Sequence, residues 1–176
     1  MDLGQRILAS YVKAVNDALE KYFPNGQDNL TQAMNYAFAV GGKRLRPAIT
    51  LAMCEALGGD KAKALPLACA LEMLHTSSLI YDDLPCMDND SLRRGKPSNH
   101  VVYGEGIPLL AGLGLNAKSY SAVTDAVNEG IISCQQGIDA IALLSAASGL
   151  EGIVPGQALD LKNKDNAILT ENELTE

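Results

Sequence analysis

Four aspartates within nine residues are the part of this sequence best suited to chemistry. Asp82, Asp83, Asp88 and Asp90 directly follow an apolar helical pattern. Carboxylates gathered beside apolar residues repel one another and lose hydration, so they need a compensating cation or hydrogen-bond network. Oxygen ligands without a nearby Cys or His pair suit Mg²⁺, which commonly bridges carboxylates and substrate phosphates. The cluster therefore predicts a magnesium site for a phosphorylated substrate.

Basic residues follow the aspartates at once, as Arg93, Arg94 and Lys96. Arginine binds phosphate oxygens in a bidentate way, and two adjacent arginines can address two anions on opposite sides of a loop. The simplest interpretation is a diphosphate held by Mg²⁺ and arginine. The alternative is a solvated helix end in which acids and bases only pair with one another.

A second basic segment lies upstream in the sequence GGKRLRP, residues 41–47. Two glycines permit a tight turn just before a helix N-terminus, whose free N–H groups favour an anion. Lys43 and Arg46 lie three residues apart there and could grip one diphosphate together. A nuclear-localisation-like or solvated basic patch is the alternative, but three cations are few for it and an apolar helix follows.

The helix that precedes the acids has one face that repeats every three to four residues: Leu71, Leu74, Ser78 and Asp82. Pro85 must end this helix, and the turn that follows can bring Asp88 back toward Asp82. His75 lies two helical turns before Asp82 and faces broadly the same side. A lone histidine on an apolar helix is more often a packed core residue than a ligand.

The segment DDLPCMDNDSLRRGKPSNH resembles the first aspartate-rich motif of the trans-isoprenyl diphosphate synthases, the farnesyl and geranylgeranyl diphosphate synthase family. GGKRLRP resembles a second hallmark of that family, and GLEGIVPGQALDL (residues 149–161) a third. The resemblance implies an all-α bundle around a central apolar pocket, a homodimer, and Mg²⁺ as cofactor. It also implies head-to-tail prenyl transfer from an allylic diphosphate to isopentenyl diphosphate.

The same resemblance assigns roles to single residues. It implies that Mg²⁺ for the allylic diphosphate is held by three catalytic carboxylates, Asp82, Asp83 and Asp88. Arg93 would contact the allylic diphosphate, whereas the isopentenyl site would consist of Lys43, Arg46, His75 and Arg94. The role of Arg44 is open, and Gln157 and Asp160 match a GQxxD helix that either contacts ligand or packs beside the pocket.

Product length is predicted from the helix turn before Asp82. Farnesyl-producing relatives resemble one another in an aromatic ring at the position of Ser77, which blocks extension. Ser77 and Ser78 leave that depth open, with Leu74 or Leu71 further down as the floor. The resemblance therefore implies a product longer than farnesyl diphosphate, most simply geranylgeranyl diphosphate.

The chain also departs from the family pattern, at Ser91, Val101, Leu113 and Pro155. The larger departure is that a Lys-Thr-Gly segment and a second aspartate-rich motif do not follow. We therefore expect one polyprenyl synthetase domain, residues 1–176, that stops before the second motif and alone turns over little substrate. The alternatives are a non-catalytic subunit or shortened paralogue that partners a complete synthase, and a fragment of a longer product. A terpene cyclase would share the acidic motif but would have no use for GGKRLRP.

Composition limits the class of partner. The formal net charge of −7 disfavours nucleic acid. Four cysteines without a CxxC pair indicate free thiols in a reducing compartment. We found neither a secretory signal nor a run of about 18 apolar residues, so we expect a cytoplasmic chain with no transmembrane segment.

The hydrophobic period predicts helices over residues 3–19, 30–40, 47–57, 61–81, 107–127, 129–148 and 149–164, the last broken at Pro155-Gly156. The helix over residues 61–81 is the most apolar and is expected to be central. No long β-branched alternation occurs, so the predicted class is all-α.

Overall fold

The computed structural model describes residues 3–23 and 26–164, and most of these are helical. The predicted all-α class is confirmed. The chain divides into two compact units, residues 1–140 and 141–176, and each is treated by itself below. The prediction of a single domain stays a prediction.

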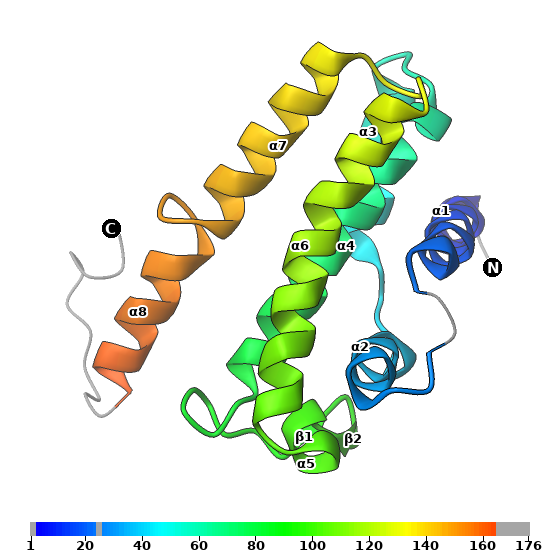
Figure 1. Ribbon diagram of the computed structural model, residues 1–176. Coiled ribbons are helices and arrows are strands. Elements are labelled where there is room, and N and C mark those ends of the chain that lie inside the picture. Colours follow the sequence, from blue (N-terminus) through cyan, green and yellow to red (C-terminus); the bar gives the residue numbers. More distant parts are fainter. Residues whose placement is uncertain (1–2, 24–25, 165–176) are drawn as a thin grey trace. The chain divides into compact units, whose positions relative to one another are not determined.

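The first unit contains the helices that carry the predicted site. They are α1 (Leu3–Leu19), the short 3-10 helix η1 (Glu20–Tyr22), α2 (Asn29–Ala39), α3 (Leu45–Ala56), α4 (Lys61–Asp82), α5 (Asn99–Tyr103) and α6 (Gly106–Asn128). In Figure 1, α4 and α6 lie side by side and run up the picture, while α1 and α2 are seen nearly end-on and so cross them.

The core lies between α4 and α6. The completely buried side chains of these two helices are mostly small, and they include Ala68, Cys69, Ala111 and Ala122. Small side chains let two helices approach closely, and burying their methyl groups contributes roughly 0.8 kcal/mol per group. The predicted central position of α4 follows from this packing.

Helix α4 begins and ends as its sequence predicts. Asp60 caps its N-terminus by accepting a hydrogen bond from the Ala62 N–H at 2.9 Å. The helix ends at Asp82, three residues before Pro85. In the turn that follows, the Asp88 N–H donates to the Asp82 carbonyl at 2.9 Å, so the chain does return toward Asp82.

A small hairpin, which the sequence analysis did not predict, presents the two arginines. Strands β1 (Leu92–Arg93) and β2 (Lys96–Pro97) pair in antiparallel fashion across a two-residue turn. The turn residues Arg94 and Gly95 both have positive φ, 55° and 78°. Such turns match the twist of paired strands, although glycine or asparagine is the usual first residue.

Within the first unit, two predicted helix starts differ from the structure by more than one residue. Helix α3 begins at Leu45, two residues before the expected Pro47, because Arg44 already turns the chain. Helix α7 (Cys134–Ser148) begins five residues later than predicted. Its start is fixed by Ser133 and Gln136, each of which accepts a hydrogen bond through its side chain from the other's N–H, at 3.2 and 2.9 Å.

The second unit contains the end of α7 and helix α8 (Ile153–Asn163). The prediction that Pro155-Gly156 breaks this helix was wrong. Pro155 lies in its first turn, where a missing N–H removes no helical hydrogen bond. The acidic tail, residues 169–176, which the sequence predicts to have no helix of its own, lies outside the described residues.

By length and composition alone, one described stretch would suffice to cross a membrane. It is Cys134–Asn163, with a mean hydropathy of 1.5. Core helices of soluble proteins pass the same test but are mostly buried, whereas 17% of the apolar window of this stretch is buried. The expectation of no transmembrane segment stays a prediction.

Candidate functional site

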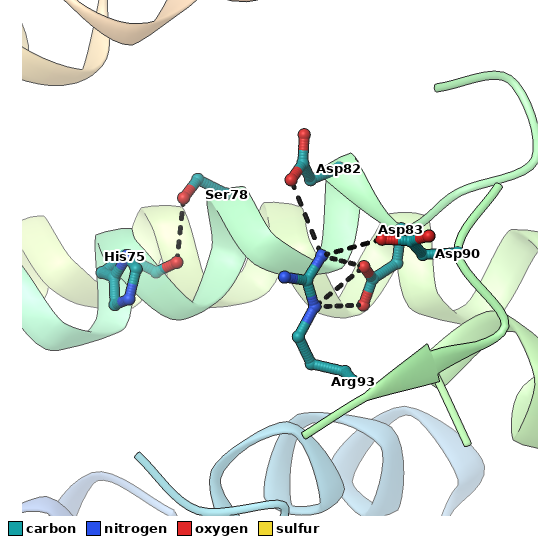
Figure 2. Close-up of polar contacts among 6 residues, drawn as sticks. All are labelled: His75, Ser78, Asp82, Asp83, Asp90 and Arg93. Carbon is teal, nitrogen blue, oxygen red and sulfur yellow. Dashed lines mark hydrogen bonds and ion pairs between the residues drawn. The ribbon is translucent and has the colours of Figure 1, made fainter. Parts of the chain in front are cut away.

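A partly exposed strip in the second half of α4 carries the predicted site residues. Leu71, His75, Ser78 and Asp82 are partly exposed, whereas most side chains between them are buried. Figure 2 shows His75, Ser78 and Asp82 along this helix, with Arg93 approaching from strand β1. His75 and Asp82 are seven residues apart, which corresponds to about 10.5 Å along the helix axis.

Arg93 lies among three of the four clustered carboxylates. Its Nε donates to both carboxylate oxygens of Asp83, at 2.9 and 3.2 Å, and its Nη2 also contacts Asp83. The same Nη2 lies 3.6 Å from Asp82 and 3.8 Å from Asp90 (Figure 2). The hydrogen bonds to Asp83 raise the pKa of Arg93. The guanidinium supplies the compensating cation that the acidic cluster requires.

The predicted metal ligands differ in their surroundings. Asp83 is only 3% exposed and its carboxylate is engaged by Arg93. The role of Asp83 as an Mg²⁺ ligand stays a prediction. Within residues 3–23 and 26–164, no three carboxylate, imidazole or thiol groups gather as a metal cluster. The residues present still suit Mg²⁺. A backbone hydrogen bond joins Asp88 to Asp82 across the turn, and this ion commonly uses one or two carboxylates plus phosphate oxygens and water.

The second predicted site forms a basic cavity of about 170 Å³. The residues that line it come from the loop before α3, from α4 and from the hairpin turn: Lys43, Arg44, Leu45, Arg46, Glu72, His75 and Arg94. The structure thus brings together all four residues of the expected isopentenyl site. Lys43, Arg46 and Arg94 are exposed and can meet a ligand from solvent.

His75 is neutral at physiological pH. Burial and the nearby charges of Arg46, Arg94, Arg44 and Arg93 lower its pKa from the ordinary value of 6.5 to about 4. Its Nε2 lies 3.4 Å from Nη1 of Arg46. Because arginine can only donate, Nε2 accepts and the ring proton resides on Nδ1.

The two serines one turn before Asp82 differ in burial. Ser77 is 2% exposed and donates to the Leu74 carbonyl at 2.8 Å. Ser78 is partly exposed on the same strip as Asp82 and donates to the His75 carbonyl at 2.9 Å. Both hydroxyls bond back to their own helix, so neither side chain extends away from it.

Sequence reasoning missed the partners of Arg44. This side chain is buried and pairs with Glu72 at 2.7 Å. One signal was available, since a lone glutamate in the most apolar helix needs a buried cation. Gln157 and Asp160, the other open assignments, lie on α8 in the second unit.

A known family covers most of the chain. The family model for polyprenyl synthetases matches residues 27–176. The chain belongs to the polyprenyl synthetase family. The family resemblance that the sequence motifs indicated is therefore confirmed.

Named members of this family share nearly half of the aligned residues. A heterodimeric geranylgeranyl pyrophosphate synthase large subunit of Arabidopsis thaliana is 44% identical over 85% of this chain and 41% of its own length. A farnesyl diphosphate synthase of Geobacillus stearothermophilus is 45% identical over 97% of this chain and 57% of its own. The crystal structure of a geranyltransferase from Legionella pneumophila matches with a TM-score of 0.90 and 33% identity, over 97% of this chain and 60% of that one. The chain thus spans about half the length of the polyprenyl synthetases it matches.

Proposed function

We propose that this chain carries the substrate-binding part of a short-chain prenyltransferase, which joins isopentenyl diphosphate to an allylic diphosphate. The observation that carries the proposal is the pair of anion sites along one helix. The basic cavity at His75 and the acidic turn at Asp82 are both built on α4, about two helical turns apart. Two diphosphates held at this spacing on one rigid element would bring their hydrocarbon ends together.

The basic cavity suits the diphosphate of isopentenyl diphosphate. The positive charge comes from Lys43, Arg46 and Arg94. Among the residues that line the cavity, Glu72 carries the one carboxylate, and it is already paired with Arg44. Neutral His75 carries its proton on Nδ1. Such a ring can donate one hydrogen bond to a phosphate oxygen without adding a charge. The site therefore binds an anion and has no group placed to attack it.

The acidic turn suits an allylic diphosphate with Mg²⁺. Asp82 and Asp88 would hold the ion, which when bound neutralises charge on the departing diphosphate. Arg93, oriented by Asp83, would contact the same diphosphate through the remaining N–H groups of its guanidinium. The role of the protein is then to position the two substrates and to keep water from the cation that forms.

We further propose that the product is longer than farnesyl diphosphate, with geranylgeranyl diphosphate as the simplest case. Positions 77 and 78 of α4 carry serines and no aromatic ring, and the hydroxyls of Ser77 and Ser78 turn back to the helix. Relatives of similar identity are named as geranylgeranyl or as farnesyl diphosphate synthases. The comparisons therefore support the class of reaction but do not distinguish the product length.

The test is calorimetric titration of the 176-residue chain with isopentenyl diphosphate. We expect the double variant Lys43→Ala/Arg46→Ala to bind at least tenfold more weakly, because two charge-assisted contacts to one anion are lost. Lys63→Ala is the matched control, since Lys63 is exposed on α4 and does not line the cavity. Equal affinity of the double variant and this control would contradict the proposed isopentenyl site.

A further inference from the structure

We propose that Arg44 is a positioning residue, whose buried guanidinium anchors the loop that presents Lys43 and Arg46 to the substrate diphosphate. The proposal rests on the isopentenyl site proposed above. It separates the three cations of the segment GGKRLRP into two exposed ligands and one buried anchor.

The anchor reaches three helices. Arg44 Nη1 donates to Glu72 on α4 at 2.7 Å, and its Nε donates to Asn16 on α1 at 3.1 Å. Its Nη2 donates to the carbonyl of Phe38 on α2 at 3.3 Å, and the guanidinium lies 5.5 Å from the centre of the Phe38 ring. All three nitrogens are thus engaged by protein groups.

Burial excludes a direct role in holding substrate. Arg44 is 8% exposed and Glu72 is 2% exposed, whereas Lys43 and Arg46 on either side are exposed. Because Glu72 offsets the charge of Arg44, the attraction of the cavity for an anion comes from the other cations. The role of the Arg44–Glu72 pair is geometric. The planar guanidinium of arginine fixes the direction of the loop more strictly than the flexible ammonium of a lysine would.

The backbone at Arg44 shows what the anchor holds in place. Its φ of 48° and ψ of 32° are left-handed, a conformation that costs free energy for any residue with a Cβ. This turn directly precedes α3, and the Arg44 carbonyl accepts the Ala48 N–H at 3.1 Å as the helix begins. Relaxation of Arg44 to the right-handed region would redirect Lys43 relative to the first turn of α3, which carries Arg46.

Glu72 connects this anchor to the rest of the site. It lies three residues before His75, on the adjoining turn of α4. The loop is therefore fixed to α4 on the turn next to His75, and Arg46 lies 3.4 Å from the imidazole. The space is also tight, since a Cβ at Gly42 would lie 2.7 Å from the guanidinium of Arg44 and 2.8 Å from that of Arg94.

The test combines affinity with a spectroscopic signature. We expect Arg44→Lys to weaken binding of isopentenyl diphosphate about tenfold, with a larger loss for Glu72→Gln, which leaves the buried Arg44 charge unpaired. In Arg44→Lys, the NMR titration of His75 should shift from a pKa of about 4 toward 6.5, because Arg46 is no longer held beside the ring. Binding of an allylic diphosphate with Mg²⁺ at Asp82 should remain within twofold.

Two further variants keep the result interpretable. Arg6→Lys, on the exposed part of α1, is the control for an arginine-to-lysine change. The double variant Arg44→Gln/Glu72→Gln removes both charges and keeps a hydrogen-bonding pair, so it should bind more tightly than Arg44→Gln alone.

The outcomes are distinct. Unchanged affinity and an unchanged His75 titration in Arg44→Lys would overturn the proposal, as would an equal loss of affinity for both substrates. The proposed function fails if the unmodified chain does not bind isopentenyl diphosphate. It also fails if Lys43→Ala/Arg46→Ala binds this substrate as tightly as Lys63→Ala does. The His75 titration would still show whether Arg44 positions Arg46.

Discussion

Arg93 and Asp83 form a bidentate ion pair that joins the hairpin to the end of α4. The side chain of Asp83 is 5% exposed and that of Arg93 is 28% exposed, so the pair lies at the edge of the core. The side chain of Asp82, which directly precedes Asp83, is 22% exposed and lies farther from the same guanidinium, at 3.6 Å. Two adjacent aspartates of one motif therefore have different surroundings.

Substitution of these two aspartates should separate stability from binding. Asp83→Asn removes the charge partner of a partly buried arginine and should lower the free energy of unfolding by about 2 kcal/mol. Asp82→Asn should change it by less than about 0.5 kcal/mol, as is usual for more exposed pairs, yet abolish Mg²⁺-dependent binding of an allylic diphosphate. Urea unfolding and calorimetry on both variants would measure this. Equal losses of stability would show that the difference in burial has no energetic consequence.

The sequence predicted those features that depend on local rules. The end of α4 before Pro85 and the face shared by His75 and Asp82 follow from proline chemistry and the helical period. The partners of Asp83 could not be predicted in this way, because a carboxylate in an acidic motif has the same sequence signature whether it meets a metal or an arginine.

Long-range pairings were also beyond sequence reasoning. Arg44 and Glu72 are 28 residues apart and meet only because α3 and α4 pack together. The hairpin formed by β1 and β2 was missed because each of these strands has two residues, too few for an alternating pattern. The left-handed turns at Arg44 and Arg94 gave no signal, since glycine or asparagine is the usual mark of that conformation.

His75 should make the stability of the chain depend on pH. Its pKa is about 4 in the folded chain and near 6.5 when unfolded, so the unfolded state takes up its proton first as pH falls. Stability should be independent of His75 above pH 6.5 and should decline between pH 6.5 and 4. The loss should be on the order of 1 kcal/mol, since the ring is half-buried and solvent screens the arginines.

The measurement is the unfolding free energy of the unmodified chain minus that of His75→Gln, taken from pH 7.5 to 4. Other carboxylates titrate in both proteins, so the difference isolates His75. Inorganic diphosphate should raise the pKa of His75 in NMR titration, because the anion offsets the arginine charges. A difference that stays constant with pH would contradict the assignment of a neutral histidine.

Ser77→Tyr should shorten the product of a synthase that carries this segment. Ser77 is almost fully buried, so the ring cannot fit where the hydroxyl lies and must extend beside α4, one turn before Asp82. We expect a shift toward the fifteen-carbon product and a loss of about 1–3 kcal/mol of stability from overpacking. Chromatography of dephosphorylated products measures the first effect and thermal unfolding the second. Ser78→Ala is the control, since it removes only a hydroxyl bonded to its own helix, and an unchanged product in Ser77→Tyr would show that this turn does not set the length.

Replacement of glycine by alanine should have opposite effects on stability at Gly112 and at Gly114 of α6. A Cβ at Gly112 would lie 2.5 Å from the ring of Tyr81, whereas one at Gly114 would meet only the flexible side chain of Met34, at 3.4 Å. At an unobstructed position inside a helix, alanine in place of glycine raises the free energy of unfolding by about 0.5–1 kcal/mol. Gly114→Ala should therefore stabilise the chain.

Gly112→Ala should instead lower stability by about 1–3 kcal/mol, because the Tyr81 ring must move within a packed interface. Since Tyr81 directly precedes Asp82, the shift should also weaken Mg²⁺-dependent binding of an allylic diphosphate, while isopentenyl binding at the basic cavity stays within twofold. Thermal unfolding and calorimetry on the two alanine variants test both effects. If both variants gain stability, Tyr81 can move freely. The close approach of α6 at Gly112 then does not fix the end of α4.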